Sequence, residues 1–133
     1  MKIIDGTNAV LGRLASYSAK QALLGEEIVI LNCDKVIITG NRKNIIEDFQ
    51  ARKRRIGSGQ KGPKHSRLAH LIVKRAVRGM LFHRSGPGKE AFRRITCYTG
   101  IPEKYKDAKK IVAGKEKRAK FIHVGELAKS REE

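Results

Sequence analysis

Apolar residues in the first third of the chain recur at two different spacings. Residues 2–5 form one short strand, and residues 27–31 form the continuous apolar, β-branched run that is typical of a strand buried in a parallel sheet. A helical stripe lies between them, ends at Gly25 and contains Leu11, Leu14, Ala15, Ala19, Ala22 and Leu23. The turn at residues 6–8 supplies helix-capping residues. We therefore predict a strand–helix–strand unit with a right-handed crossover.

A third β-type run, at residues 36–39, is followed by a second helix. Gly40 and Asn41 break the run, and a helix is predicted over residues 42–54. Its inner face is expected to consist of Ile45, Ile46 and Phe49.

Two segments rich in glycine and proline, residues 56–66 and 82–88, are predicted to be loops. A helix is predicted between them from the apolar stripe Ala69, Ile72, Val73, Ala76, Val77 and Met80. Ser66 is in position to cap this helix. The cations that fall off the stripe are Arg67, Lys74, Arg75 and Arg78. The helix is therefore expected to bury one face and to expose a basic one.

The pattern weakens after the second loop. A short helix is expected at residues 89–93 and a strand at residues 95–98. Beyond Gly100 the chain is rich in lysine and weakly patterned, so we expect a peripheral extension with one short helix near residues 126–129.

Positive charge is concentrated in the segment that contains both loops. The 133 residues carry a formal net charge of +17; residues 51–94 hold 14 Lys and Arg but one acidic residue, Glu90, whereas residues 1–50 are neutral overall. A solvated surface mixes both signs, so a block of one sign indicates an interaction surface. An apolar fraction of 40% suits one domain with a real core, which a disordered basic tail lacks.

A polyanion is the expected partner of this charge, and the candidates are nucleic acid, an anionic membrane and an acidic protein. No apolar run is long enough to span a bilayer and no signal peptide is recognisable, so we expect a cytoplasmic protein without a membrane partner. Aromatic residues make up 5% of the chain and Trp is absent, which favours recognition of the backbone and shape of a nucleic acid over base stacking. Cys33 and Cys97 are expected to be buried, reduced thiols, with a single disulfide as the alternative.

The cations around the two loops are the candidate phosphate ligands. One or two cations are enough to interact with the dipole at a helix end, so the remaining cations of the run at residues 52–55 are expected to bind another partner. Arginine can place two donors on one phosphate, and the second loop opens a helix whose backbone N–H groups bind anions. The predicted RNA-binding residues are Arg52, Lys53, Arg54, Arg55, Lys61, Lys64, His65, Arg67, Lys74, Arg78, Arg84, Lys89, Arg93 and Arg94.

Nucleotide and metal chemistry are not supported by the motifs. Gly57 and Gly62 have the spacing of a Walker A motif, but Pro63 and Lys64 stand where Lys and Ser or Thr belong, and residues 5–12 lack the dinucleotide-binding spacing. No cofactor and no small-molecule substrate are therefore expected.

The histidines do not form a catalytic or metal-binding pattern. The four are His65, His70, His83 and His123. None lies at metal-ligand spacing from a cysteine or a carboxylate, and nothing positions two of them as a ribonuclease would require. Asp5 and Asp34 each follow a strand, where turns and caps favour aspartate.

Ordered motifs in residues 1–100 resemble the family of the universal large-subunit ribosomal protein thirteen. These motifs are DGTN at 5–8, LGRLA at 11–15, NCDKV at 32–36, TGN at 39–41, AVRGML at 76–81 and AFR at 91–93. Residues 52–66 and the lysine-rich end are similar to the archaeal and eukaryotic branch of that family rather than to the bacterial one.

The resemblance implies an α/β fold with three layers, α/β/α, and a parallel or mixed sheet of about four strands. Residues 1–100 would form the rRNA-binding domain that carries the basic segment 51–94, with residues 101–133 as an extension packed on or beside it. It also implies a structural constituent of the large subunit that binds large-subunit rRNA beside neighbouring ribosomal proteins, supports assembly and is not an enzyme. The alternatives are an RNA-processing enzyme or nucleotide-dependent factor, and an mRNA-binding translational regulator.

Overall fold

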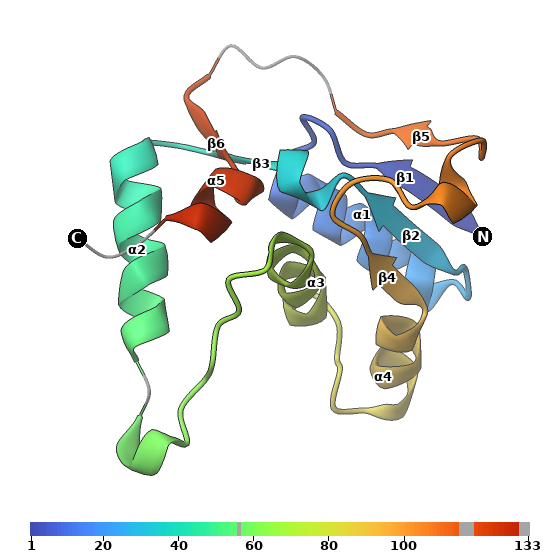
Figure 1. The fold of residues 1–133 in the computed structure, drawn as a ribbon. Helices are drawn as coiled ribbons and strands as arrows, with labels where there is room; N and C mark the ends of the chain where they lie inside the picture. The colour runs from blue at the N-terminus through green and yellow to red at the C-terminus, as the bar shows by residue number, and fades with distance from the viewer. Residues whose placement is uncertain (56, 115–118, 131–133) are drawn as a thin grey trace.

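Four strands form a parallel sheet at the centre of the computed structural model, which describes residues 1–55, 57–114 and 119–130 (Figure 1). Across the sheet the strands are ordered β4 (Ile95–Cys97), β2 (Ile28–Leu31), β1 (Lys2–Asp5) and β5 (Ile111–Val112). Each neighbouring pair is parallel. The strand–helix–strand prediction is confirmed, because β1 and β2 pair directly with Ile4 opposite Ile30.

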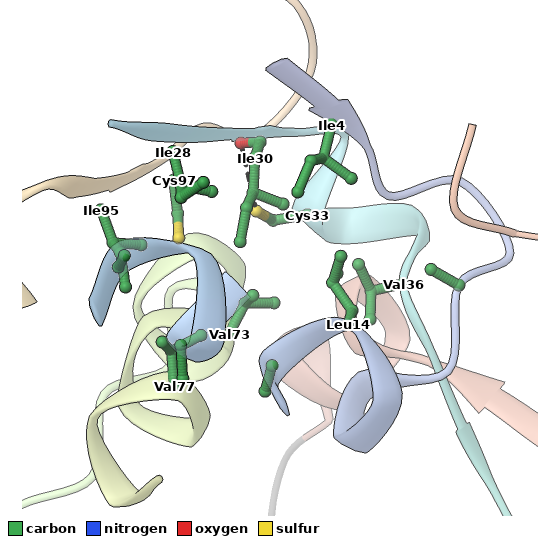
Figure 2. Packing of buried hydrophobic residues seen from close by; sticks show 14 of the residues in the cluster. Ile4, Leu14, Ile28, Ile30, Cys33, Val36, Val73, Val77, Ile95 and Cys97 are labelled. Carbon is green, nitrogen blue, oxygen red and sulfur yellow. Dashed lines mark hydrogen bonds between the residues drawn. The ribbon is translucent and has the colours of Figure 1, made fainter. Parts of the chain in front are cut away.

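Helices cover one face of this sheet: α1 (Leu11–Leu23), α3 (Ala69–Gly79) and α4 (Gly86–Arg93). Figure 2 shows the contact layer, in which isoleucines of the sheet face apolar residues of α1 and α3. The labelled isoleucines are Ile4, Ile28, Ile30 and Ile95, and the labelled residues of the two helices are Leu14, Val73 and Val77. Burying one such side chain contributes about 1.5–3 kcal/mol, so this layer fixes α3 against the sheet.

The opposite face of the sheet is covered more thinly, by the 3-10 helix η3 (Glu103–Tyr105). Val29 and Leu31 of β2 are buried against Tyr105. The ring of Tyr105 lies 5.8 Å from that of Tyr98, centroid to centroid. All of β2 is therefore buried, as its continuous apolar run predicted. The four-stranded sheet is parallel with helices on its flanks, and the expected three-layer α/β/α class is confirmed.

The C-terminal part returns to the body of the protein. β3 (Ile37–Thr39) pairs antiparallel with β6 (Phe121–His123), and α5 (Val124–Lys129) follows directly. The backbone N–H of Val124 donates to the carbonyl oxygen of Val36 over 2.8 Å. The β-type run at residues 36–39 and the short helix near residues 126–129 are thus confirmed. Strands β5 and β6 were not predicted.

Helix α2 (Arg42–Arg54) has the predicted bounds but lies at the edge of the fold, beside α5 (Figure 1). The expected inner face of Ile45, Ile46 and Phe49 is only half-buried. Gln50 is the buried residue of this helix, and its side-chain nitrogen donates to the carbonyl and hydroxyl oxygens of Ser130. Among the described residues, therefore, nothing covers part of the apolar side of α2.

Several predicted helix ends are corrected. Residues 86–88, expected in a loop, form the first turn of α4, because proline is tolerated at the start of a helix. Ser66 is not the N-cap of α3: that position is Leu68, whose N–H donates to the Ser66 hydroxyl. Leu23 and Met80 belong to predicted apolar stripes but are 52% and 46% exposed, because they lie at helix ends beyond the covered face.

The turn after β1 is held by Asp5 rather than by a helix cap. One carboxylate oxygen of Asp5 accepts hydrogen bonds from the Thr7 N–H, the Thr7 hydroxyl and the Asn32 amide. Burial by itself raises the pKa of Asp5, but the hydrogen bonds from Asn32 and Thr7 outweigh it and leave the pKa lowered. The N-cap of α1 is Val10, without a side-chain cap, so residues 6–8 do not cap that helix.

Cys33 and Cys97 are free and buried, as the interpretation of two reduced thiols expects. Both side chains lie in the layer between the sheet and α3 (Figure 2). Hydrogen bonding to Cys97, followed by burial, raises the pKa of the Cys33 thiol. The Cys33 thiol is therefore held in its protonated form.

Candidate nucleic-acid interface

Cations from α2, α3 and the loop between them line a single groove of about 660 Å³. The basic side chains on it are Arg52, Lys64, His65, Lys74, Arg75 and Arg78. Apolar side chains of five helices line the rest, including Leu11, Phe49, Ile72, Phe92 and Leu127. We call this feature the basic groove. Val73 and Val77 of the α3 stripe are buried in the core, whereas Ile72 and Ala76 of the same stripe line the groove together with the cations of α3.

The loop before α3 is fastened to that helix. The Arg75 guanidinium donates to the Lys64 carbonyl oxygen over 3.2 Å. Gly57 has a φ of +75°, and a Cβ placed on it would lie 2.8 Å from the Cα of Gly62. Close packing of these two backbones, rather than a nucleotide site, thus accounts for the glycine spacing that resembles a Walker A motif.

Like charges lie close together around the basic groove. Burial, with the nearby charges of Arg75 and Arg52, lowers the pKa of His65. Burial and the charge of Arg67 lower the pKa of Lys53 in the same way. Asp48 pairs with Arg52 at 3.1 Å and is the one acidic residue on the groove within the described parts of the chain. Such repulsion is relieved by a bound polyanion.

The cations at and just before α4 differ in their surroundings: some are exposed and one is hydrogen-bonded to the protein. Arg84, Lys89 and Arg93 are exposed. Arg94, by contrast, donates to the carbonyl oxygen of Ala22 at the end of α1 over 2.9 Å, so its guanidinium helps to hold α4 against α1.

The structure brings together part of the predicted set. The basic groove collects Arg52, Lys64, His65, Lys74 and Arg78. The remaining predicted residues do not line it: Lys53, Arg54, Arg55, Lys61, Arg67, Arg84, Lys89, Arg93 and Arg94. Arg75 was absent from the predicted set although it lines the groove. Its position off the apolar stripe of α3 was the signal that identified it as surface-facing.

Membrane-spanning and metal-binding features are absent from the described residues, 1–55, 57–114 and 119–130. No helix there is sufficiently long and apolar to cross a membrane. No cluster of three or more His, Cys, Asp or Glu side chains within those ranges could hold a metal ion.

Comparison with known proteins identifies the family of this chain. The family described as ribosomal protein L13 matches residues 1–104, which is most of the chain. The chain therefore belongs to the ribosomal protein L13 family. The members of this family are structural proteins of the ribosome, so the expectation that the chain is not an enzyme is confirmed.

Archaeal relatives named large ribosomal subunit protein uL13 match over most of their length. The protein of Methanocaldococcus jannaschii is 41% identical over 132 residues, covering 97% of this chain and 96% of the relative. That of Thermoplasma acidophilum is 40% identical with the same coverage of both chains. The Methanococcus maripaludis protein is 46% identical over 106 residues, or 77% of each chain. The resemblance to the archaeal branch is thereby confirmed.

Proposed function

We propose that this protein is a structural constituent of the large ribosomal subunit that binds large-subunit rRNA through the basic groove and supports assembly of the subunit in the cytoplasm. The family and the names of the archaeal relatives support the ribosomal part of the proposal. The convergence of cations from α2, α3 and their connecting loop supports the RNA-binding part.

The chemistry of the groove suits a phosphate backbone. Arg52, Arg75 and Arg78 can each place two donors on a phosphate, and Lys64 and Lys74 add point charges beside them. Backbone contacts position a protein on RNA without reading its sequence. Selection of the target would then come from the shape of the folded rRNA.

Exposed cations outside the groove extend the proposed interface. Arg84 precedes α4, Lys89 and Arg93 lie on it, and Lys61 and Arg67 lie in the loop that leads into α3. We assign them to the same RNA surface. Neighbouring large-subunit proteins are the other proposed partners. Arg94 is left out of the proposed RNA contacts because it is bound to Ala22.

Nucleotide-resolution footprinting on large-subunit rRNA tests this proposal. The wild-type protein should protect a defined set of nucleotides, and the double variant Arg52→Glu, Lys64→Glu should lose that protection. A matched control, Lys106→Glu, Lys109→Glu, changes the charge equally at exposed positions beyond the basic segment and should protect as the wild type does. Absence of wild-type protection, or equal loss in both variants, would refute it.

A further inference from the structure

Phe82 is presented to solvent in the turn between α3 and α4. Its side chain is 81% exposed, more than that of any other large apolar residue among those described, whereas the adjacent Leu81 is 6% exposed. Leu81 anchors the turn in the core and Phe82 points away from it. An exposed phenylalanine forgoes the stabilisation of about 1.5–3 kcal/mol that burial would give, so a covering partner is the natural reason to keep it.

The backbone of Phe82 is fixed although its ring is exposed. The Phe82 carbonyl oxygen accepts hydrogen bonds of 3.1 Å from both the N–H and the hydroxyl of Ser85. A Cβ placed on Gly88 would lie 2.1 Å from the same oxygen, so the first turn of α4 packs directly on it. The ring therefore projects from a held turn, which lowers the entropic cost of ordering it on binding.

The charged residues nearest to this ring in the sequence are positive. His83, Arg84 and Lys89 follow it, and residues 79–89 contain no acidic side chain. Arg84 and Lys89 are exposed. A partner that matches both features needs a flat apolar face next to negative charge. An unpaired nucleotide has both, since its base stacks on aromatic rings and its phosphates bind cations.

We propose that Phe82 stacks on an unpaired base of the bound RNA while Arg84 and Lys89 contact the phosphates beside that base. This inference rests on the proposed function and extends it. The basic groove recognises the backbone, whereas Phe82 restricts docking to RNA that has a base free to stack. The scarcity of aromatic residues argued against an aromatic platform, and a single exposed ring is compatible with that scarcity.

Binding of purified protein to large-subunit rRNA tests the inference, with four variants at exposed positions. Phe82→Ala removes the ring, Phe82→Leu keeps apolar area without a stacking face, and Phe82→Trp keeps the stacking face. Leu24→Ala removes another exposed apolar side chain, 70% exposed, outside the basic segment. Alanine and leucine at position 82 should weaken binding by about 5- to 150-fold, and Phe82→Trp and Leu24→Ala should stay within about threefold of the wild type.

Each way in which the inference could fail would give a distinct result. If Phe82→Ala binds rRNA as tightly as the wild type while wild-type binding is salt-dependent, the stacking inference is wrong and the proposed function stands. If the wild type does not bind rRNA, the proposed function itself is wrong. If Phe82→Leu binds rRNA like the wild type, the ring makes a simple apolar contact and the stacking inference is wrong. If Phe82 is needed for binding to vesicles of anionic lipid but not to rRNA, its partner is a lipid surface and the stacking inference is again wrong. The melting temperature of each variant shows that the fold is retained.

Discussion

The guanidinium of Arg75 on α3 donates a hydrogen bond of 3.2 Å to the carbonyl oxygen of Lys64 in the preceding loop. One side chain thus both lines the basic groove and sets the path of the loop that carries Lys64 and His65. This bond ties the position of the loop to a helix that is anchored in the core.

Replacing Arg75 by lysine should weaken RNA binding even though the charge is kept. Lysine cannot hold the Lys64 carbonyl and a phosphate with one planar group. Losing a hydrogen bond of this kind costs about 0.5–1.5 kcal/mol, so we expect the Kd for large-subunit rRNA to rise about 2- to 12-fold. Arg75→Gln, which also removes the charge, should weaken RNA binding further. Arg13→Lys, on the exposed side of α1, is the control. A Kd unchanged by Arg75→Lys would show that the anchor is dispensable.

Gly88→Ala should destabilise the protein, whereas Gly86→Ala should not. The new methyl group at position 88 would meet the Phe82 carbonyl at 2.1 Å, and at position 86 it would meet nothing within 4 Å. Overpacking of this kind costs about 1–3 kcal/mol. Urea unfolding of both variants measures the difference in the free energy of unfolding. Equal stability of the two would contradict the close packing of α4 on the turn.

Removing the Asn32 amide should reduce stability through Asp5. The folded-state pKa of Asp5 is lowered below 3.8, so its contribution is fully present above that pH and is lost as the pH falls through the folded-state pKa. Asn32→Ala should cost about 1–3 kcal/mol at neutral pH. The difference between the Asn32→Ala and Asn8→Ala variants, which share the backbone cost, should narrow as Asp5 is protonated.

Asn8→Ala is the matched control for this variant. Asn8 and Asn32 have φ values of 60° and 55°, so the backbone cost of alanine is similar at both positions. The difference between the two variants in urea unfolding isolates the hydrogen bond to Asp5. If both lose equal stability, the hydrogen bond contributes nothing.

RNA affinity should increase as the pH is lowered, through His65. Burial and the charges of Arg75 and Arg52 lower the pKa of His65 in the free protein. Phosphates in the groove would raise the pKa of His65, so His65 takes up a proton on binding when the pH lies between its free and bound pKa values. Above both pKa values the RNA affinity no longer depends on pH. The Kd measured from roughly pH 5 to 8 should show this dependence. His65→Gln should remove it, and an unchanged pH profile in that variant would exclude His65.

The core elements were predictable from the sequence because their apolar residues carry a clear period. Val73 and Val77 lie on the stripe of α3 and are fully buried, and β2 is buried throughout. Strands β5 and β6 were not predictable, since runs of two and three residues have no period of their own and form only by pairing with β1 and β3. The start of α4 was missed because glycine and proline there indicate a loop more often than a helix.

The candidate site was predictable in composition but not in arrangement. Charge counting identified the segment, yet Arg94 is held by Ala22 and Arg75 lines the groove, and sequence alone does not distinguish these two roles. The sequence also did not predict that Phe82 is exposed and Leu81 buried, because either of these adjacent apolar residues could have pointed inward. Which side chain faces the core depends on how the turn packs against α4.

The slope of log K against log salt for binding to large-subunit rRNA tests the central claim, that the basic groove binds phosphates, most directly. The wild type should show a steep negative slope. Lys64→Gln, Arg78→Gln should flatten it by about 0.7–0.9 for each phosphate that the variant no longer neutralises, while Lys106→Gln, Lys109→Gln should leave it unchanged. An affinity that does not depend on salt, or an equal change of slope in both double variants, would contradict the account.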